Sequence, residues 1–562
     1  MNEDKQLRFG ILCNGLVFQR WQAEIIRGLR ADGHQLKLIV LNAAFSNKNK
    51  VNTLRKKLPL NQLLYRFCYR FVFKTKWRKQ VNMCVELNHV PTQVCHVWSE
   101  GYSEYFLPED VEYIRNQQLD FILRFGFNII RGEILDVAKS GVWSFHHGDE
   151  QQYRGGPPGF WEIYDSNRIT GAVLQRLTHR IDGGVILKKG WFGTIKHSYK
   201  EQLDHIIGGS MPFVKQVCHD MITDRAEYLD APPSNTNAQI YRIPGNLQML
   251  VFLLKIIRNR ILFHVKDIML SEHWNIGLID ASPAKVAFNW RRYRGRVRWF
   301  KPLPVKLFRA DTFFFRHEEK PYVLCERFDY RTMKGLIELI TLDKEYRFSS
   351  AKTAIDGEGH FSFPFTFSLD NQIYCIPETS ATGLTNLYRF NPDIKRFEWE
   401  RVLINQPLID PVLVHYQNRW WLFATLPTNA SGALYLWFAQ SLDEPFIAHP
   451  ENPVKTDVRS SRAAGPFMVL DGFLYRPAQN ASRTYGGSIV INQVISLTPL
   501  EYIEQQVVEL KPDDDWIFSA GMHTIAGDDK ITVIDAKRHQ FSPTASFNKL
   551  KRKLTYERKK SR

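Results

Sequence analysis

The chain has 562 residues and a formal net charge of +17, and 44% of its residues are hydrophobic. This length exceeds what one hydrophobic core usually organises, so we expect two domains. The seven cysteines include no CxxC pair, the N-terminus shows no apolar leader, and no run of about 18 apolar residues occurs. These features exclude a disulfide scaffold and predict a cytoplasmic protein with no spanning helix and no metal site.

The first 230 residues have the pattern of an α/β domain. An apolar strand pattern, a helical pattern and a second strand pattern open the chain, and two further buried strands follow, at residues 8–15, 18–33, 36–43, 119–127 and 141–148. This order predicts a Rossmann-like open sheet, in which ligands bind beyond the carboxyl ends of the strands. The first turn lacks GxGxxG, so no dinucleotide fingerprint is present.

A histidine and a Gly/Pro-rich loop follow the strand expected at residues 141–148. His146 ends the apolar run, Tyr153-Arg154-Gly155 comes next in the loop, and Asp182 stands before a Gly-Gly pair. These elements, in this order and spacing, resemble the catalytic core of the folate-dependent formyltransferases, a family that acts on methionyl-tRNA, glycinamide ribonucleotide and amino sugars. The resemblance implies a formyltransferase-like fold for this domain.

The resemblance also implies catalytic roles. His146 would donate to the developing oxyanion or carry a proton, and Asp182 would orient His146 and help to deprotonate the attacking amine. The asparagine that the family places two residues before the histidine is Ser144 here. The Ser144 side chain is shorter than that of asparagine, so three alternatives stay open. Ser144 would act through a water molecule or a shifted substrate, His147 would take the asparagine's role, or the domain would have lost or changed its chemistry.

Substrate contacts are implied for the loop. Tyr153, Arg154 and Gly155 would bind the acceptor, with Arg154 holding a phosphate or carboxylate. The donor, 10-formyltetrahydrofolate, would bind near residues 123–130. The expected acceptor is an amino sugar, free on a nucleotide or on a growing surface polysaccharide.

Basic stretches interleaved with apolar residues occur at 47–80, 247–266 and 549–562. The second lies within a predicted linker and basic amphipathic helix (residues 231–270), and the third forms most of a basic tail (residues 546–562). Such stretches predict either peripheral contact with the inner face of an anionic membrane or ordinary helices packed on the core. No recognition motif accompanies the charge, so we expect no nucleic acid.

Residues 271–545 change to short alternating strands separated by turns. Similar units begin at residues 308, 360, 408, 463 and 519, and each reads as one four-stranded blade. The pattern predicts an all-β five-bladed β-propeller. It resembles the glycoside hydrolase family 43-like propellers and the N-terminal region of the plant glucosamine inositolphosphorylceramide transferases.

Acidic side chains near the starts and ends of these units are candidates for the propeller funnel. They are Asp311, Glu378 and Asp410, and His360, Arg462, His523 and Asp535 are further funnel candidates. The second unit starts HFSFP without an aspartate, which breaks the family 43 set of three carboxylates. Glycan or glycolipid-headgroup binding is therefore favoured over hydrolysis, with a structural or docking role as the other reading.

Together these patterns favour a formyltransferase-like enzyme that formylates an amino sugar in surface-glycan biosynthesis. Two alternatives stay open. The same scaffold would serve a glycan-assembly transferase with another donor, such as a nucleotide sugar. It would also serve a non-catalytic carbohydrate-binding protein.

Overall fold

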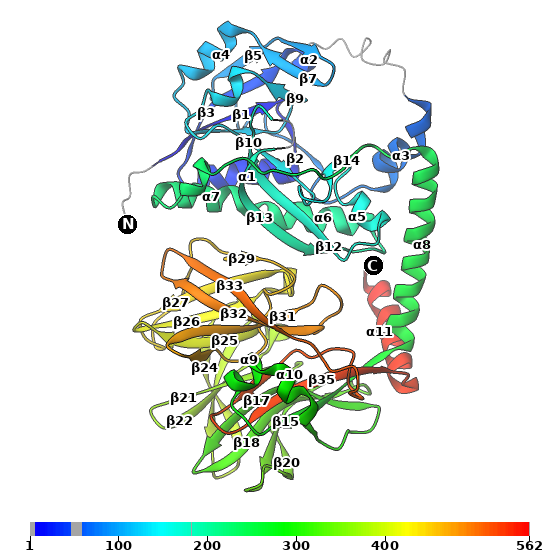
Figure 1. The fold of residues 1–562 in the computed structure, drawn as a ribbon, viewed down its shortest axis with the longest axis vertical. Coiled ribbons are helices and arrows are strands. Elements are labelled where there is room, and N and C mark those ends of the chain that lie inside the picture. Colours follow the sequence, from blue (N-terminus) through cyan, green and yellow to red (C-terminus); the bar gives the residue numbers. More distant parts are fainter. Residues whose placement is uncertain (1–5, 47–58, 181–182, 561–562) are drawn as a thin grey trace. The chain divides into compact units, whose positions relative to one another are not determined.

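The computed structural model describes residues 6–46, 59–180 and 183–560. The chain divides into two compact units, residues 1–260 and 261–562, and the division falls inside α8 (Asn246–Met269) (Figure 1). We call them the N-terminal and the C-terminal unit. The domain boundaries expected after residues 230, 270 and 545 remain predictions. Among the described residues, no helix is long and apolar enough to cross a bilayer.

A seven-stranded sheet organises the N-terminal unit, in the order β13-β12-β10-β8-β1-β3-β5. Its strands are β1 (Arg8–Cys13), β3 (Gln35–Asn42), β5 (Thr92–Cys95), β8 (Phe121–Arg124), β10 (Val142–His146), β12 (Ile169–Arg176) and β13 (Val185–Gly193). The strands from β5 to β10 are parallel, as the sequence predicts, whereas β12 and β13 run antiparallel. Antiparallel neighbours can be joined directly, without a crossover helix.

The strand order reverses between β1 and β8. From β1 the chain adds β3 and β5 on one side and then returns to place β8 on the other side of β1. In open α/β sheets, ligands bind at the carboxyl ends of the two strands that flank such a point. The ends of β1, β8 and β10 are therefore the places to look for a site.

Helices and small sheets complete this unit. In α1 (Arg20–Ala31), buried Trp21, Ile25 and Leu29 recur at helical spacing, and the helix ends before Gly33, whose φ is +89°. The other helices are α2 (Ala43–Ser46), α3 (Leu63–Phe67), the π-helical η3 (Cys68–Val72), α4 (Pro108–Arg115), α5 (Phe160–Tyr164), α6 (Tyr199–Ser210) and α7 (Pro212–Ile222). The small sheets pair β2 (Val17–Gln19) with β4 (Gln80–Asn82), β6 (Val97–Glu100) with β7 (Ser103–Phe106) and β9 (Ile129–Arg131), and β11 (Arg154–Gly155) with β14 (Ile240–Tyr241).

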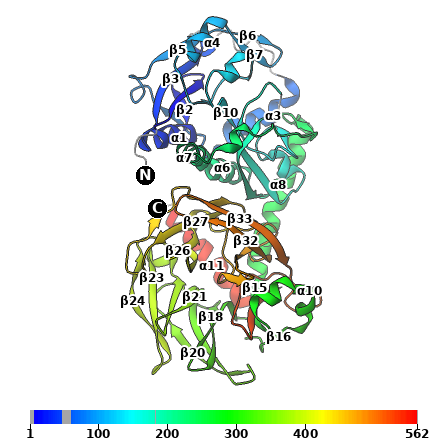
Figure 2. The ribbon, with the colours of Figure 1, turned by 60° about the vertical axis from the view of Figure 1, so that its left-hand side comes forward.

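Five antiparallel sheets build the C-terminal unit (Figure 2). Four follow in chain order: β17 (Leu307–His317) to β20 (Phe348–Ile355), β21 (Ser362–Leu369) to β24 (Arg396–Ile404), β25 (Ile409–Tyr416) to β28 (Ile447–Ala448), and β30 (Met468–Leu470) to β33 (Tyr502–Leu510). The remaining sheet joins both ends of the unit, because β15 (Ser271–Ile279) pairs with β35 (Thr532–Gln540), flanked by β16 (Arg298–Trp299) and β34 (Ile525–Gly527). The intervening strands are β18 (Lys320–Asp329), β19 (Lys334–Leu342), β22 (Gln372–Glu378), β23 (Thr385–Asn391), β26 (Arg419–Thr425), β27 (Ala433–Ala439), β31 (Phe473–Asn480) and β32 (Ser488–Leu497), and β29 (Lys455–Thr456) also pairs with β27.

The first strands of three sheets carry the same irregularity. The register slips at Asp311, Phe363 and Asp410, and their φ angles are 54°, 43° and 47°. A bulge of this kind bends a strand and re-aims its side chains. Asp311 thereby links neighbouring sheets: its backbone N–H donates to Asp535 (2.7 Å), and its carboxylate accepts from the N–H of Phe363 (3.1 Å).

Three helices flank these sheets: α9 (Pro283–Phe288), α10 (Trp290–Tyr293) and α11 (Pro543–Lys560). The stretch expected as a basic tail forms most of α11. The Nζ of Lys549 donates to the carbonyls of Asp267 and Leu270 at 2.9 Å, so this helix packs against the end of α8.

Candidate functional site

Ser144 and His146 lie at the carboxyl end of β10, on the same side of the strand because side chains alternate. Ser144 is 3% exposed, and its Oγ accepts hydrogen bonds from Arg124, at 2.9 Å from Nη2 and 3.2 Å from Nε. The parallel register of β8 and β10 brings Arg124 beside Ser144. A partly buried guanidinium is thus hydrogen-bonded to Ser144, at the position where the formyltransferase pattern has an asparagine.

Arg124 is a functional candidate that the sequence patterns did not single out. Its Nη1 donates to the carbonyl of Asn128 (2.6 Å), which orients the group from a second direction. Burial lowers the pKa of Arg124 from its ordinary value, and the Glu104 carboxylate opposes that shift. A guanidinium stays charged in proteins, so the site holds a fixed cation with several N–H donors. Only the pairing of two strands reveals it.

His146 faces the loop that follows it. Its Nε2 lies 2.8 Å from the carbonyl oxygen of Tyr153. A carbonyl only accepts, so Nε2 is the protonated nitrogen in this contact. A Cβ at Gly148 would lie 2.9 Å from both of these atoms, so the loop can close over the histidine only with glycine there.

The loop residues expected to bind substrate pack against a later segment. Arg154 and Gly155 form β11, which pairs with β14, and Arg154 Nη1 donates to the carbonyl of Ala238 (3.2 Å). Gly155 has a φ of +82°, and a Cβ there would lie 2.2 Å from the carbonyl oxygen of Tyr241. Part of the segment expected as a linker therefore holds this loop in place. Asp182 lies outside the described residues.

A small cavity of about 10 Å³ lies under this loop, and buried Glu162 of α5 borders it together with His146 and Arg154. Burial raises the pKa of Glu162 to about 8, and its Oε1 has no hydrogen-bond partner among the described residues. Glu162 is thus a second titratable group at the site that the sequence patterns missed. Burial lowers the pKa of His147 to about 3, and its ring packs against Phe145, so it is a neutral packing residue.

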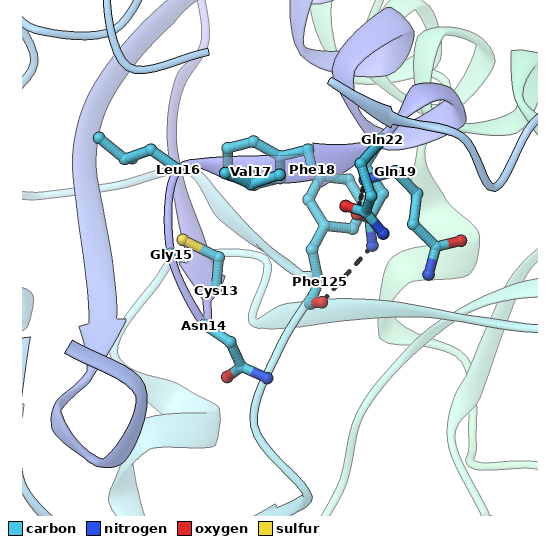
Figure 3. A pocket seen from close by; sticks show the side chains of 10 residues that line it. Cys13, Asn14, Gly15, Leu16, Val17, Phe18, Gln19, Gln22 and Phe125 are labelled. Atoms are coloured by element: carbon cyan, nitrogen blue, oxygen red, sulfur yellow. Dashed lines mark hydrogen bonds between the residues drawn. The ribbon is translucent and has the colours of Figure 1, made fainter. Parts of the chain in front are cut away.

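A larger pocket of about 290 Å³ opens at the carboxyl ends of β1 and β8, where the strand order reverses (Figure 3). Asn14 lies at its rim, where its Oδ1 accepts from the N–H of Phe127 (3.0 Å), and Gln22 Nε2 lies 3.5 Å from the carbonyl oxygen of Phe125. Amide groups and an aromatic ring thus line one concave surface. The lining residues are Cys13, Asn14, Gly15, Leu16, Val17, Phe18, Gln19, Gln22, Gln80 and Phe125.

In the C-terminal unit, the buried ring of His523 lies between two carboxylates. Its Nδ1 is 2.8 Å from Asp535, and its Nε2 is 3.0 Å from Asp311. Burial opposes the charge on His523, but these carboxylates outweigh it and raise the pKa of His523 to about 10. The three side chains could hold a metal ion. With His523 protonated between the two carboxylates, the arrangement is an ion triad; a metal would have to displace that proton.

The other expected funnel carboxylates lie in the same charged cluster. Asp410 makes a two-pronged ion pair with Arg462 (2.6 and 3.0 Å) and accepts from Gln479 (2.9 Å). Burial, and then the Asp410 carboxylate, raise the pKa of Glu378 to about 8. The structure therefore brings Asp311, Glu378 and Asp410 together in electrostatic contact. All three are paired to cations: Asp311 to His523, and both Glu378 (3.9 Å) and Asp410 to Arg462.

Glu326 is the acidic neighbour that the sequence patterns missed. It pairs across the sheet with Ala310, beside the bulge at Asp311. Burial, and then the charge of Asp311, raise the pKa of Glu326 well above its ordinary value, and its Oε1 lies 3.5 Å from Nε2 of His360, one of the further funnel candidates. Nothing in the local pattern CERFD marks this position, because its surroundings depend on strand pairing.

Residues 303–515 match the family described as "Glucosamine inositolphosphorylceramide transferase 1, N-terminal". A protein of Oryza sativa subsp. japonica with the name glucosamine inositolphosphorylceramide transferase 1 is 33% identical over 207 residues, which cover 36% of this chain and 28% of that protein. The chain thus spans less than a third of that relative's length. The residues that match the family, 303–515, lie in the C-terminal unit, so this unit is similar to part of a protein named as a transferase.

Solved structures resemble this chain only weakly. A thermostable family-43 glycoside hydrolase gives a TM-score of 0.28 at 15% identity, covering 35% of this chain and 73% of its own. A sugar 3N-formyl transferase, crystallised with dTDP and 5-N-formyl-THF, gives 0.25 at 13% identity, covering 42% of this chain and 70% of its own. Scores this low carry no argument about function.

Proposed function

We propose that the N-terminal unit transfers a formyl group from 10-formyltetrahydrofolate to the amine of an amino sugar in surface-glycan biosynthesis. The observation that carries the proposal is the meeting of Arg124, Ser144 and His146 at the carboxyl ends of neighbouring parallel strands. That is where open α/β sheets bind their ligands. The motif around His146 indicates formyl transfer as the reaction class. The pairing of β8 with β10 brings the Arg124 guanidinium to Ser144, where the formyltransferase pattern has an asparagine.

The chain's own groups suit this chemistry. 10-Formyltetrahydrofolate would supply the formyl group. As the amine nitrogen bonds to the formyl carbon, negative charge develops on the formyl oxygen; the bond from that carbon to N10 of the donor then breaks, tetrahydrofolate leaves with a proton on N10, and the amine loses a proton. Arg124, oriented by Ser144 and Asn128, offers N–H donors to that charge. His146 can receive or return a proton once it releases the Tyr153 carbonyl. The pocket of about 290 Å³ has the ring and amide groups for a planar polar heterocycle, at a size suited to part of the donor.

Arg124→Gln should lower kcat for formyl transfer by about 10²–10³, because one preorganised oxyanion donor is lost. Arg124→Lys should recover only part of the rate, because the lysine ammonium cannot reproduce the two hydrogen bonds that the guanidinium donates to Ser144 Oγ. The measurement is steady-state kinetics with 10-formyltetrahydrofolate and the acceptor. Arg131→Gln is the matched control, because Arg131 bonds Ser103 on a separate sheet. An Arg124→Gln enzyme with unchanged kcat would remove the guanidinium from the mechanism.

A stable donor mimic tests the proposal before the acceptor is known. At about 100 times its dissociation constant, 5-formyltetrahydrofolate should stabilise the native protein by roughly 2.7 kcal/mol. Thermal unfolding with and without the ligand measures this shift, and Gln22→Ala in the pocket of Figure 3 should reduce it. A clear shift leads to a screen of nucleotide-linked amino sugars. No shift at saturating ligand rejects folate as the donor.

A second candidate function rests on the C-terminal unit, whose residues 303–515 resemble part of a named glycolipid transferase. We propose that its five sheets are the blades of a β-propeller. Hydrogen bonds join four of the five pairs of successive sheets: Asp311 to Asp535, Phe363 to Asp311, Gln479 to Asp410, and Ile525 to Ala464. The fifth pair, the sheets of β22 and β25, is linked through Arg462, which contacts both Glu378 and Asp410. A glycan or glycolipid headgroup would then bind at the central cluster. If 5-formyltetrahydrofolate does not stabilise the protein, we favour a transferase that uses a nucleotide sugar as its donor.

A further inference from the structure

A concave basic surface lies beside α1 and η3 in the N-terminal unit. Its volume is about 840 Å³, and it is lined by Arg20, Tyr69, Arg70, Lys74, Thr75, Lys76, Arg78, Lys79 and Gln80. We call it the basic groove. Two carboxylates approach it among the described residues: Glu24 lies 3.7 Å from Arg20, and Asp204 accepts from the backbone N–H groups of Lys76 and Trp77. Six cationic side chains therefore share one groove, and little negative charge compensates their positive charge.

Two contacts fix the guanidinium of Arg78 in the groove. It lies 3.7 Å from the centre of the Tyr69 ring, and Nη1 donates to the carbonyl of Phe73 (3.4 Å). Its Nε is buried and has no hydrogen-bond partner among the described residues. A buried donor without an acceptor costs free energy, which a phosphate oxygen would recover. The groove thus has the charge and a positioned donor for a phosphate group.

Large apolar side chains stand exposed next to the groove. Phe67, Phe71 and Val72 of α3 and η3 are 58%, 55% and 55% exposed. The start of α8 adds a second exposed stripe at helical spacing, formed by Leu247, Leu250, Leu254 and Ile257. We call the two sets together the apolar face.

Asn246 joins these two helical segments. Its Oδ1 accepts from the N–H of Leu64 (3.1 Å), and its Nδ2 donates to the carbonyl of Leu60 (2.9 Å), so α3 lies beside the start of α8 (Figure 1). Residues 59–79 and 241–266 contain no Asp or Glu. Exposed apolar side chains on an exclusively basic background suit an anionic lipid surface. They do not suit a second copy of the chain, which would bring the same positive charge.

We propose that the basic groove binds the phosphate headgroups of anionic phospholipids while the apolar face enters the outer part of the bilayer. The protein would thereby dock on a membrane through its N-terminal unit. This inference is independent of formyl transfer, because the groove has no residue of the site at β8 and β10 and shares only Gln80 with the pocket of Figure 3, and no variant tested below changes Gln80.

Vesicle flotation of the 562-residue chain tests the proposal. Binding should be strong to phosphatidylcholine vesicles that contain phosphatidylglycerol, weak to phosphatidylcholine alone, and weaker at high salt. Lys74→Gln/Lys79→Gln should reduce partitioning about 30-fold, since each basic residue near such a surface contributes about fivefold. Phe67→Ser/Phe71→Ser should reduce it at least about tenfold. These side chains are exposed, so thermal unfolding should stay unchanged.

Matched controls come from the C-terminal unit. Arg291→Gln/Arg292→Gln removes two positive charges, and Phe473→Ser removes an exposed phenylalanine, and both should bind vesicles like the wild type. Excess inorganic phosphate should compete only weakly, because the apolar face contributes to docking; full displacement would assign the groove to a free phosphate compound instead. Equal binding to neutral vesicles, or loss of a dimer in Phe67→Ser/Phe71→Ser by size-exclusion with light scattering, would overturn the proposal.

Discussion

His523→Gln should lower the free energy of unfolding of the C-terminal unit by about 3–5 kcal/mol. The substitution removes the cation between Asp311 and Asp535, which then face each other as buried carboxylates with no cation between them. Urea unfolding followed by tryptophan fluorescence measures the loss. His415→Gln is the matched control, because His415 is exposed on β25 and should cost little. A His523→Gln variant as stable as the control would contradict the ion triad.

The same triad predicts a pH dependence. The folded-state pKa of His523 is raised to about 10, above its ordinary value of 6.5. The stability that this group contributes is therefore fully present below about pH 6.5 and is lost as the pH rises toward 10. Unfolding of the wild type should become easier over this interval, whereas His523→Gln should show a flatter profile. An equal slope in both proteins would mean that His523 is neutral in the fold.

His146→Ala should reduce kcat/KM for formyl transfer by about 10²–10⁴, the usual contribution of one general acid–base group. Its position at the end of β10, two residues beyond Ser144 and its Arg124 contact, is the reason to expect so large an effect. Chromatography of the formylated acceptor measures the rate. The KM for the donor should change little, because the pocket of Figure 3 lies at β1 and β8.

His89→Ala is the matched control for this experiment, because His89 is exposed in the same unit and contacts Arg30. It should retain full activity. His146→Asn separates two roles: an asparagine can donate a hydrogen bond but cannot carry a proton at neutral pH. Activity near the wild-type level in His146→Asn would restrict His146 to hydrogen bonding, and full activity in His146→Ala would exclude this site as the catalytic centre.

Local patterns in the sequence determined much of the secondary structure. The helix expected within residues 18–33 is α1, and the buried strands expected at 119–127 and 141–148 are β8 and β10. Four of the five repeat units, those at residues 308, 360, 408 and 463, begin at or shortly before the first strand of an antiparallel sheet, whereas the unit at 519 precedes β34 and β35, the last strands of the sheet that β15 opens. Periodicity succeeds here because each residue's neighbours along one helix or strand set which side is buried. The placement of His146 at a strand end follows from the same local reasoning.

The tertiary structure alone decided which side chains meet. Arg124 reaches Ser144 only because β8 and β10 are neighbours, and His523 reaches Asp311 only because β15 and β35 join the two ends of the C-terminal unit. No local pattern specifies such contacts, since they depend on strand order and register across long stretches of chain. The pKa values of Glu162 and His523 are likewise set by the tertiary structure, because burial and neighbouring charges arise only once the sheets have packed.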